Sequence, residues 1–375
     1  MGRHHPSDAP APDPSVAPPR RTKRRHAPWW ARLSLVLGVI LVVLSGGSLA
    51  AGSIVLTRVN HALPSNNLIG DGARKHKAGS DVKGPLDILL AGSDLRDSWK
   101  TDGQKPRTDS IMWLHIPASM DYAYLLSLPR DLRVQIPADK HTGFLGGQDR
   151  LNASFPDGMK DVNDTAGGMS LLSRTVSNLT GAEWDMAGLV NWDGFKDITK
   201  ALGGVTMCLD KGFTSHQPGF TNGPPLTFPE GCHHYDADKA LKLVRQRDDL
   251  PDGDYGRQKL QQQFIKQILK QATSKGVVGN PSKVNDLIGA AGKSITLDLG
   301  GYQLVDVALA LRGITADKIV TLQIPHYSIG QGDQYQGEGL QKPLGPQLFR
   351  AMRDDTISDL LAAHPELASK VPDGS

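Results

Sequence analysis

A short polar segment, Leu243–Gln263, carries the residue types that could bind a highly charged anion. It holds three arginines, an acid and an amide: Arg245, Arg247, Arg257, Asp254 and Gln261. A guanidinium group presents a planar fork of donors that matches phosphate oxygens, and it stays charged at physiological pH. The segment therefore predicts a clamp for an oxyanion such as a pyrophosphate, with the acid ordering the arginines. The alternative is a solvated charged loop in front of a helix.

Three short apolar runs are typical of buried strands: residues 87–92, 110–116 and 122–128. Only residues 117–121 join the last two runs, which predicts an antiparallel pair. If the first two runs also pair antiparallel, Asp94, Asp109 and Arg130 meet at one edge of the sheet. Ligands often bind at such an edge, so we expect these side chains to converge there. The alternatives are turn-capping acids and a surface ion pair between Arg130 and Asp131.

The helices that must position these residues follow from apolar periodicity: 168–181, 192–204, 237–245, 257–275 and one that begins near 343. Further strands are expected at 205–210 and 319–325. Arg257 and Gln261 are four residues apart, so both can project from the first turn of their helix, whose free N–H groups favour anions. These elements predict a mixed α/β domain with a largely antiparallel central sheet flanked by helices.

The apolar run Leu33–Leu56 contains no charged residue over 24 positions, enough for a helix that crosses a bilayer. Trp29 and Trp30 precede it, and seven Lys or Arg residues lie in residues 1–32, which predicts a cytoplasmic N-terminus. A cleaved signal peptide is the alternative, but the run is long for a signal core. We therefore expect a single-pass anchor with the bulk of the chain outside the cell.

The charge of the chain is unevenly distributed. Residues 1–32 carry a net charge of +5 and the whole chain +3, so the remainder carries −2. Any anion site in the exported part must therefore be built locally. The expected organisation is a disordered tail (1–28), a transmembrane helix (29–58), a linker (59–84), a catalytic domain (85–355) and a C-terminal end (356–375).

Only two cysteines are present, Cys208 and Cys232, and both lie on the side expected to be exported. In an oxidising compartment a disulfide between them is plausible, and closing that loop would contribute about 3 kcal/mol in a chain-entropy estimate. Two unpaired thiols remain the alternative, since spacing does not reveal geometry.

The order and spacing of several short motifs resemble the LytR-CpsA-Psr family of bacterial envelope proteins. These motifs are GSD at 92–94, RTD at 107–109, SLPRD at 127–131, RLNASF at 150–155, GCHHYDADKAL at 231–241, RQR at 245–247 and DYGRQKLQQ at 254–262. The resemblance covers Asp87–Gln263 and continues weakly to about residue 350. The proline- and glycine-rich composition favours an actinobacterial source.

The resemblance implies a phosphotransferase that moves a glycopolymer from a polyprenyl-pyrophosphate carrier to peptidoglycan. Asp94 and Asp109 would hold Mg²⁺ beside the pyrophosphate, a donor set that suits this cation. The residues implied to contact or order the pyrophosphate are Arg107, Arg130, Arg245, Arg247, Arg257, Gln261 and Asp254. Leu260 departs from the family, which often has a basic residue there. The leucines at 171–179 could line a slot for the lipid, although an ordinary core is the favoured interpretation.

Three alternatives compete with transfer. The same site could hydrolyse polyprenyl pyrophosphate, with water replacing the sugar hydroxyl. A non-catalytic anchored receptor would bind lipid-linked glycans without turnover. A DNA-binding regulator is disfavoured, because the basic tail has no helix-turn-helix pattern and the folded part is expected across the membrane from DNA. No nucleic-acid partner is therefore expected.

Overall fold

The computed structural model describes residues 67–70, 73–77, 80–95, 103–216, 225–247, 249–250, 252–273, 289 and 295–369. All of them belong to one compact unit, Leu56–Ser375. The predicted tail and transmembrane helix, residues 1–58, lie outside the described residues. None of the helices within the described ranges combines the length and apolar character that a bilayer crossing requires.

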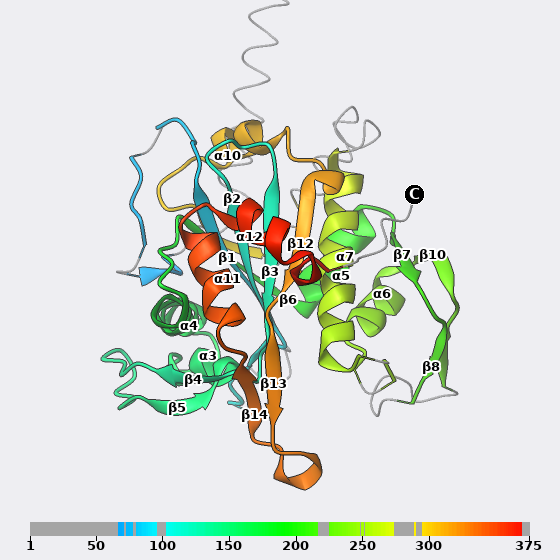
Figure 1. Cartoon of the computed structure of the whole chain (residues 1–375), viewed down its shortest axis with the longest axis horizontal. Helices are drawn as coiled ribbons and strands as arrows, with labels where there is room; N and C mark the ends of the chain where they lie inside the picture. The colour runs from blue at the N-terminus through cyan, green and yellow to red at the C-terminus, as the bar shows by residue number, and fades with distance from the viewer. Residues whose placement is uncertain are drawn as a thin grey trace, which may run out of the picture. The chain divides into compact units, whose positions relative to one another are not determined.

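A six-stranded mixed sheet forms the centre of this unit, in the order β11-β6-β1-β2-β3-β12 (Figure 1). Its strands are β1 (Leu86–Ser93), β2 (Thr108–Ile116), β3 (Ala123–Leu128), β6 (Met186–Asn191), β11 (Ile295–Asp298) and β12 (Ile319–Gln323). β2 runs antiparallel to both β1 and β3, and β11 runs antiparallel to β6. β1–β6 and β3–β12 are parallel pairs. The predicted mixed, largely antiparallel sheet is confirmed.

Helices cover both faces of this sheet, so its strands are buried on both sides (Figure 1). The main helices are α4 (Thr165–Thr180), α5 (Trp192–Ala201), α6 (Ala237–Val244), α7 (Asp254–Thr273), α10 (Leu304–Leu311), α11 (Leu344–Arg353) and α12 (Ile357–Ala363). Along β2, Ile111 and Trp113 enter the core beneath α4 and α11, whereas Met112 and Leu114 enter the core beneath α7 and α10. This alternation is the two-residue period of a strand.

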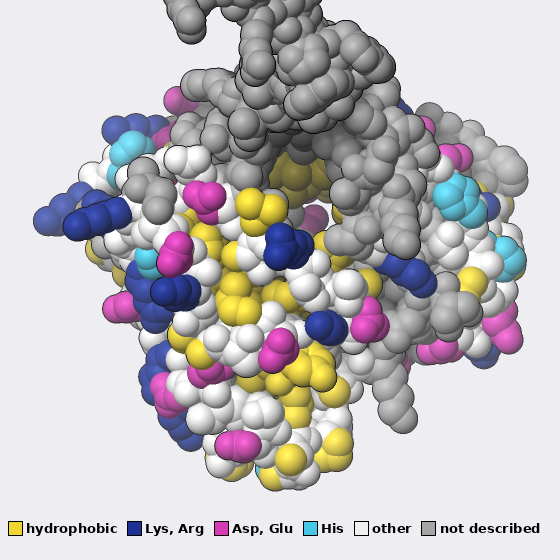
Figure 2. All heavy atoms as spheres, turned by 90° about the horizontal axis from the view of Figure 1, so that it is seen from above, with side chains coloured by type: hydrophobic (Ala, Val, Ile, Leu, Met, Phe, Trp, Pro, Cys, Tyr) yellow, Lys and Arg dark blue, Asp and Glu magenta, His cyan; other side chains and the backbone are white. Residues whose placement is uncertain are grey.

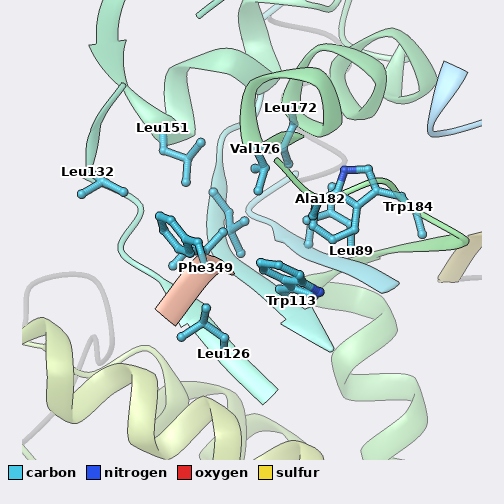
Figure 3. Close-up of a cluster of buried hydrophobic side chains, with 14 of the residues drawn as sticks. Leu89, Trp113, Leu126, Leu132, Leu151, Leu172, Val176, Ala182, Trp184 and Phe349 are labelled. Atoms are coloured by element: carbon cyan, nitrogen blue, oxygen red, sulfur yellow. The ribbon is translucent and has the colours of Figure 1, made fainter. Parts of the chain in front are cut away.

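The larger core is built on two indole rings (Figure 3). Trp113 and Trp184 meet edge to face with ring centroids 5.7 Å apart. Each indole N–H has an acceptor, because Trp113 Nε1 donates to Asp87 Oδ1 at 2.7 Å and Trp184 Nε1 donates to the Ser173 carbonyl at 3.2 Å. Leu171, Leu172 and Val176 pack into this core and are fully buried, which agrees with the favoured interpretation of the helix at 168–181.

Four small antiparallel pairs surround the main sheet. They are β4–β5 (Arg133–Ile136 and Gly147–Arg150), β7–β10 (Val205–Leu209 and Gly231–Tyr235), β8–β9 (Phe213–Ser215 and Leu226–Phe228) and β13–β14 (His326–Ile329 and Gly337–Leu340). Cys208 and Cys232 face each other directly in the β7–β10 pair and form a disulfide. The plausible disulfide of the sequence is therefore present in the structure. It fixes the register of the pair that precedes α6.

The folded part begins upstream of Pro85, which differs from the linker expected at 59–84. Leu68 and Ile69 are fully buried, and the backbone N–H groups of both donate to Asp298 Oδ2 at 2.9 and 3.1 Å. Two adjacent apolar residues have no periodicity, so the pattern that marks helices and strands does not detect them.

A buried network of charged residues, His115, Asp87 and Asp355, lies at the end of β2. His115 is fully buried, with Nδ1 2.8 Å from Asp87 Oδ1 and Nε2 3.0 Å from Asp355 Oδ1. Burial acts to lower the pKa of His115, but the hydrogen bonds and charges of Asp87 and Asp355 outweigh it and raise that pKa above its ordinary value of 6.5. The imidazolium thus links the first strand to the turn after α11.

Replacement of His115 by Gln should lower the free energy of unfolding by about 3–5 kcal/mol below pH 6.5, because two carboxylates lose a buried cation. A group whose pKa is raised on folding makes its full contribution to the stability of the fold below its unfolded pKa, about 6.5. It loses that contribution as the pH rises through the folded pKa. The difference between wild type and variant should therefore shrink at higher pH. Urea unfolding of the full chain, followed by tryptophan fluorescence from pH 5.5 to 8.5, measures it.

His364 provides the matched control, since its imidazole is 39% exposed and pairs with Glu366 on the surface. His364→Gln should change the unfolding free energy by less than about 0.5 kcal/mol at every pH. A His115→Gln effect that stays constant from pH 5.5 to 8.5 would contradict the charged state assigned to His115.

Candidate anion-binding site

The strand ends meet as the sequence predicts. Ser93 pairs with Thr108, and Ile111 pairs with Leu128, so Asp94, Asp109 and Arg130 stand at one edge of the sheet. The parallel strands β6 and β12 end at the same edge, because Asn191 is in register with Ser93 and Gln323 with Ser127. Five strands therefore present their termini to one region.

Asp94 closes the loop between β1 and β2. Its backbone N–H donates to the Arg107 carbonyl at 3.1 Å, and its Oδ1 accepts from the Arg107 backbone N–H at 2.7 Å. These two hydrogen bonds fix the Asp94 carboxylate at the end of β1. The Arg107 side chain is exposed and lines a neighbouring cavity.

Arg130 is held by two carboxylates. Its Nη1 lies 2.5 Å from Asp109 Oδ1, its Nε lies 3.5 Å from Asp131 Oδ2, and the side chain is 17% exposed. Burial opposes its charge, but the charges of Asp109 and Asp131, together with the hydrogen bond to Asp109, raise the pKa of Arg130 further. The alternative of a simple surface pair between Arg130 and Asp131 therefore does not describe this site.

Arg257 is the buried cation of the site, with only 5% of its surface exposed. Its Nη2 lies 2.5 Å from Asp254 Oδ1 and 3.5 Å from the backbone carbonyl oxygen of Asp109. Burial and the like charges of Arg130 and Arg247 lower the pKa of Arg257, and Asp254 and Asp109 only partly oppose them. The two like charges therefore lie close enough to act on Arg257, and an anion bound there would relieve their repulsion.

The end of α6 brings Arg245 to the same edge. Arg245 caps this helix, and its guanidinium carbon lies 3.6 Å from the centroid of the Trp192 ring, at the start of α5 directly after β6. The Gln261 side-chain amide donates to the Val244 carbonyl at 3.4 Å. Gln261 thus ties the first turns of α7 to the turn that carries Arg245, a positioning contact that the sequence did not predict.

The structure therefore assembles a cluster that we call the arginine clamp: Arg130, Arg245, Arg247 and Arg257, with Asp109 and Asp254. It has more cationic than anionic groups. On the face drawn in Figure 2, by contrast, basic and acidic side chains are interspersed among apolar ones. The clamp suits a ligand with several anionic oxygens, because each guanidinium can donate two hydrogen bonds to such a group.

The two aspartates supply the oxygen donors that Mg²⁺ prefers when it also binds phosphate. Asp94 and Asp109 stand at the facing ends of the paired strands β1 and β2, and the Asp109 side chain is 33% exposed. Within the described ranges, no group of three or more His, Cys, Asp or Glu side chains is placed to hold a metal ion. By its chemistry, a pair of aspartates suits a cation that takes its other ligands from substrate oxygens and water.

Two buried amides that the sequence analysis missed hold α7 in place. Gln262 Nε2 donates to the Leu322 carbonyl at 2.7 Å and to Ser127 Oγ at 2.8 Å, so it joins β12 to β3. Gln263 accepts from the Cys208 N–H and donates to the Cys208 carbonyl, both at 3.1 Å. Apolar periodicity does not detect polar residues on the buried face of a helix. The run of three glutamines at 261–263 was the available signal.

Substitution of Gln262 by Ala should lower the free energy of unfolding by about 2–3 kcal/mol, since the Leu322 carbonyl and Ser127 lose a buried donor. It should also weaken anion binding, because α7 carries Arg257 and Asp254. Chemical unfolding and calorimetric titration with pyrophosphate measure the two effects. Gln303, an exposed glutamine that makes no capping hydrogen bond at α10, is the control. Equal stabilities of Gln262→Ala and Gln303→Ala would contradict this role.

This chain matches one family pattern and is similar to several known proteins. The LytR_cpsA_psr family pattern matches residues 54–352. Cell wall biosynthesis protein LcpA of Corynebacterium glutamicum is 29% identical over 346 residues, which cover 85% of this chain and 64% of that relative. The polyisoprenyl-teichoic acid–peptidoglycan teichoic acid transferase TagU of Oceanobacillus iheyensis is 28% identical over 319 residues, which cover 84% of this chain and 89% of that relative.

Solved structures share the fold of this chain. The crystal structure of TagV of B. subtilis matches with a TM-score of 0.55 at 22% identity and covers 73% of this chain and 98% of that chain. TagT bound to LIIa-WTA matches with a TM-score of 0.54 at 19% identity and covers 77% of this chain and 98% of that chain. At these identities the likeness establishes the mixed α/β fold.

Proposed function

We propose that this chain, which belongs to the LytR-CpsA-Psr family, is a phosphotransferase that moves a phosphoglycosyl polymer from a polyprenyl-pyrophosphate carrier to peptidoglycan. Its relatives support this proposal, since one is named a cell wall biosynthesis protein and another a transferase of polyisoprenyl-linked teichoic acid to peptidoglycan. The relative from Corynebacterium also supports an actinobacterial source.

The observation that carries the proposal is the buried Arg257 among other guanidinium groups. A nine-tenths buried arginine that two further arginines repel is costly unless an anion neutralises the cluster. A pyrophosphate that is esterified at both ends still offers four non-bridging oxygens in a compact group, which matches the forked donors of several arginines. The arginine clamp thus fits the pyrophosphate, which is the part of a lipid-linked glycan at which the reaction takes place.

The chemistry needs charge neutralisation and alignment more than a covalent intermediate. An acceptor hydroxyl attacks the phosphorus on the glycan side, a new P–O bond forms to the acceptor, and the bridging P–O bond breaks. Polyprenyl monophosphate leaves with the bonding electrons, and the hydroxyl proton passes to a base. Arg130, Arg247 and Arg257 would stabilise the charge that grows on the leaving phosphate, because fixed donors need no reorganisation during the step.

The remaining residues would position this machinery. Asp254 orients Arg257, and the Trp192 ring supports Arg245. Asp94 and Asp109 would hold Mg²⁺ against the pyrophosphate, and when bound the cation would neutralise phosphate charge. Asp109 would also fix Arg130 through its 2.5 Å ion pair.

We also propose a single-pass anchor in the cell membrane, with a cytoplasmic N-terminus and an extracytoplasmic catalytic domain. The uncharged run Leu33–Leu56 and the preceding basic residues support it. A membrane anchor would place the clamp on the side where lipid-linked glycans and peptidoglycan meet.

Loss of Arg245 and Arg247 together should weaken binding of a short-chain polyprenyl pyrophosphate by about 100-fold or more. Each charged hydrogen bond contributes about 1.5–3 kcal/mol, and about 1.4 kcal/mol corresponds to a tenfold change. Calorimetric titration of the full chain, wild type and Arg245→Ala/Arg247→Ala, measures this. Product analysis with and without peptidoglycan separates transfer from hydrolysis and from binding without turnover.

Arg312→Ala is the matched control, because Arg312 is exposed at the end of α10. It should leave affinity and turnover unchanged. If the folded wild type does not bind the pyrophosphate, the arginine clamp serves another anion and the proposed function fails.

The metal assignment predicts a second result. Mg²⁺ should tighten pyrophosphate binding to the wild type by about tenfold, and Asp94→Asn and Asp109→Asn should each remove most of this gain, since an amide is a much weaker ligand for a hard cation. The same titration with and without Mg²⁺ measures it. Asp317→Asn at an exposed acid should keep the full gain. An undiminished Mg²⁺ effect in both site variants would exclude these aspartates as ligands.

A further inference from the structure

A second basic cavity lies beside the arginine clamp. It has a volume of about 480 Å³, within the range of about 300–1,000 Å³ that is usual for small-ligand sites. Its lining includes three arginines, two amides and one acid: Arg107, Arg133, Arg150, Asn152, Gln336 and Asp149. The formal charge of the lining is therefore positive. Its lining residues come from the hairpin β4–β5, from the turn after β5 and from the residues just before β2 and β14.

Ion pairs, a backbone hydrogen bond and a ring contact hold two arginines of the cavity in place. Arg133 lies 3.5 Å from Asp149 Oδ1, and its Nη2 donates to the Gln148 carbonyl at 3.3 Å. Arg150 lies 3.6 Å from Asp131 Oδ1 and 5.4 Å from the centroid of the Tyr335 ring. Both guanidinium groups are about one third exposed, so they can still donate to a ligand.

Two contacts join this cavity to the clamp, and a third joins it to Asp94. Asp131 pairs with Arg150 through one oxygen and with Arg130 through the other. The backbone N–H of Asn152 donates to the Arg130 carbonyl at 2.9 Å. Arg107 lines the cavity, and its backbone N–H donates to Asp94 Oδ1. A molecule bound in the clamp and a group in the cavity would therefore be neighbours.

Asn152 is a buried polar residue in the wall of the cavity. Its side chain lines the cavity and the residue is only 3% exposed. Its Oδ1 has no hydrogen-bond partner among the described residues. A buried amide oxygen without a donor costs about 1–3 kcal/mol. A small rotation of the Asn152 amide toward the cavity would let a hydroxyl or N–H of a bound molecule satisfy it.

We propose that this cavity binds an acidic saccharide, a sugar unit that carries a carboxylate or phosphate next to hydroxyl groups. The guanidinium groups match the anion, and Asn152 and Gln336 match hydroxyls. The proposal deepens the proposed function and rests on it for the identity of the neighbouring group: the sugar belongs either to the polymer beside its pyrophosphate or to the acceptor chain. In both cases the cavity selects glycans that bear charge.

The test uses the full chain and four probes: glucuronate, glucose 6-phosphate, glucose and inorganic pyrophosphate. Arg133→Gln/Arg150→Gln should weaken binding of the two acidic sugars at least tenfold, because two charged donors are lost. It should change pyrophosphate affinity less than threefold, and Arg150→Lys should restore part of the sugar affinity. Arg312→Gln is the control for loss of a charge elsewhere. In transfer assays, a raised KM for the donor or for the acceptor identifies which of them supplies the sugar.

The outcomes separate the two proposals. Acidic sugars that bind wild type and the folded double variant equally well, or that bind no better than glucose, overturn the cavity assignment. If pyrophosphate does not bind while the sugars bind through Arg133 and Arg150, the cavity stands and the proposed phosphotransferase fails. A double variant that loses pyrophosphate as well, with an unchanged unfolding midpoint, shows that the cavity is not a separate subsite and overturns the proposal.

Discussion

The repulsion among guanidinium groups at one sheet edge is the constraint on which the site depends. Two like charges about 6 Å apart repel by about 3 kcal/mol at an effective dielectric constant of about 20. Arg257 is buried beside Arg130 and Arg247, and its pKa is lowered by burial first and then by these neighbours. Such an arrangement persists only because surrounding groups fix it. The cluster is therefore pre-organised for anion binding, because its hydrogen-bond donors are already in place before the anion enters.

Each part of the fold contributes to holding this cluster together. The register of β1, β2 and β3 places Asp109 against Arg130. The helix α7 carries Arg257, and its buried amides attach it to backbone carbonyls rather than to apolar side chains alone. A hydrogen bond has a fixed direction, whereas apolar packing tolerates sliding, so Gln262 and Gln263 set the position of α7 along its axis. The disulfide stabilises the strand pair to which Gln263 binds.

The sequence predicted the parts that depend on local pattern. Apolar runs located β1, β2 and β3, and a short connection implied the antiparallel pairing of β2 and β3. The convergence of Asp94, Asp109 and Arg130 was predicted on the condition that β1 and β2 also pair antiparallel. The parallel strand β6 was missed, and so the contact between Trp192 and Arg245 could not be foreseen, because it depends on two segments that only the tertiary fold brings together. Leu68 and Ile69, and the amides of α7, were missed because neither follows a hydrophobic period.

The cavity beside the clamp was also beyond prediction, for a physical reason. Arg133 and Arg150 are opposite each other on β4 and β5, a pair of short strands whose residues are mostly polar. In a sequence, such residues are typical of a solvated hairpin. The fold orients these side chains, because β14 packs beside β4 and the Glu338 N–H donates to the Asp131 carbonyl at 2.8 Å. Asp131 then shares its two carboxylate oxygens between Arg130 and Arg150, so one acid orients a cation in each site. The two sites therefore share one positioning carboxylate, while each keeps its own set of cationic donors.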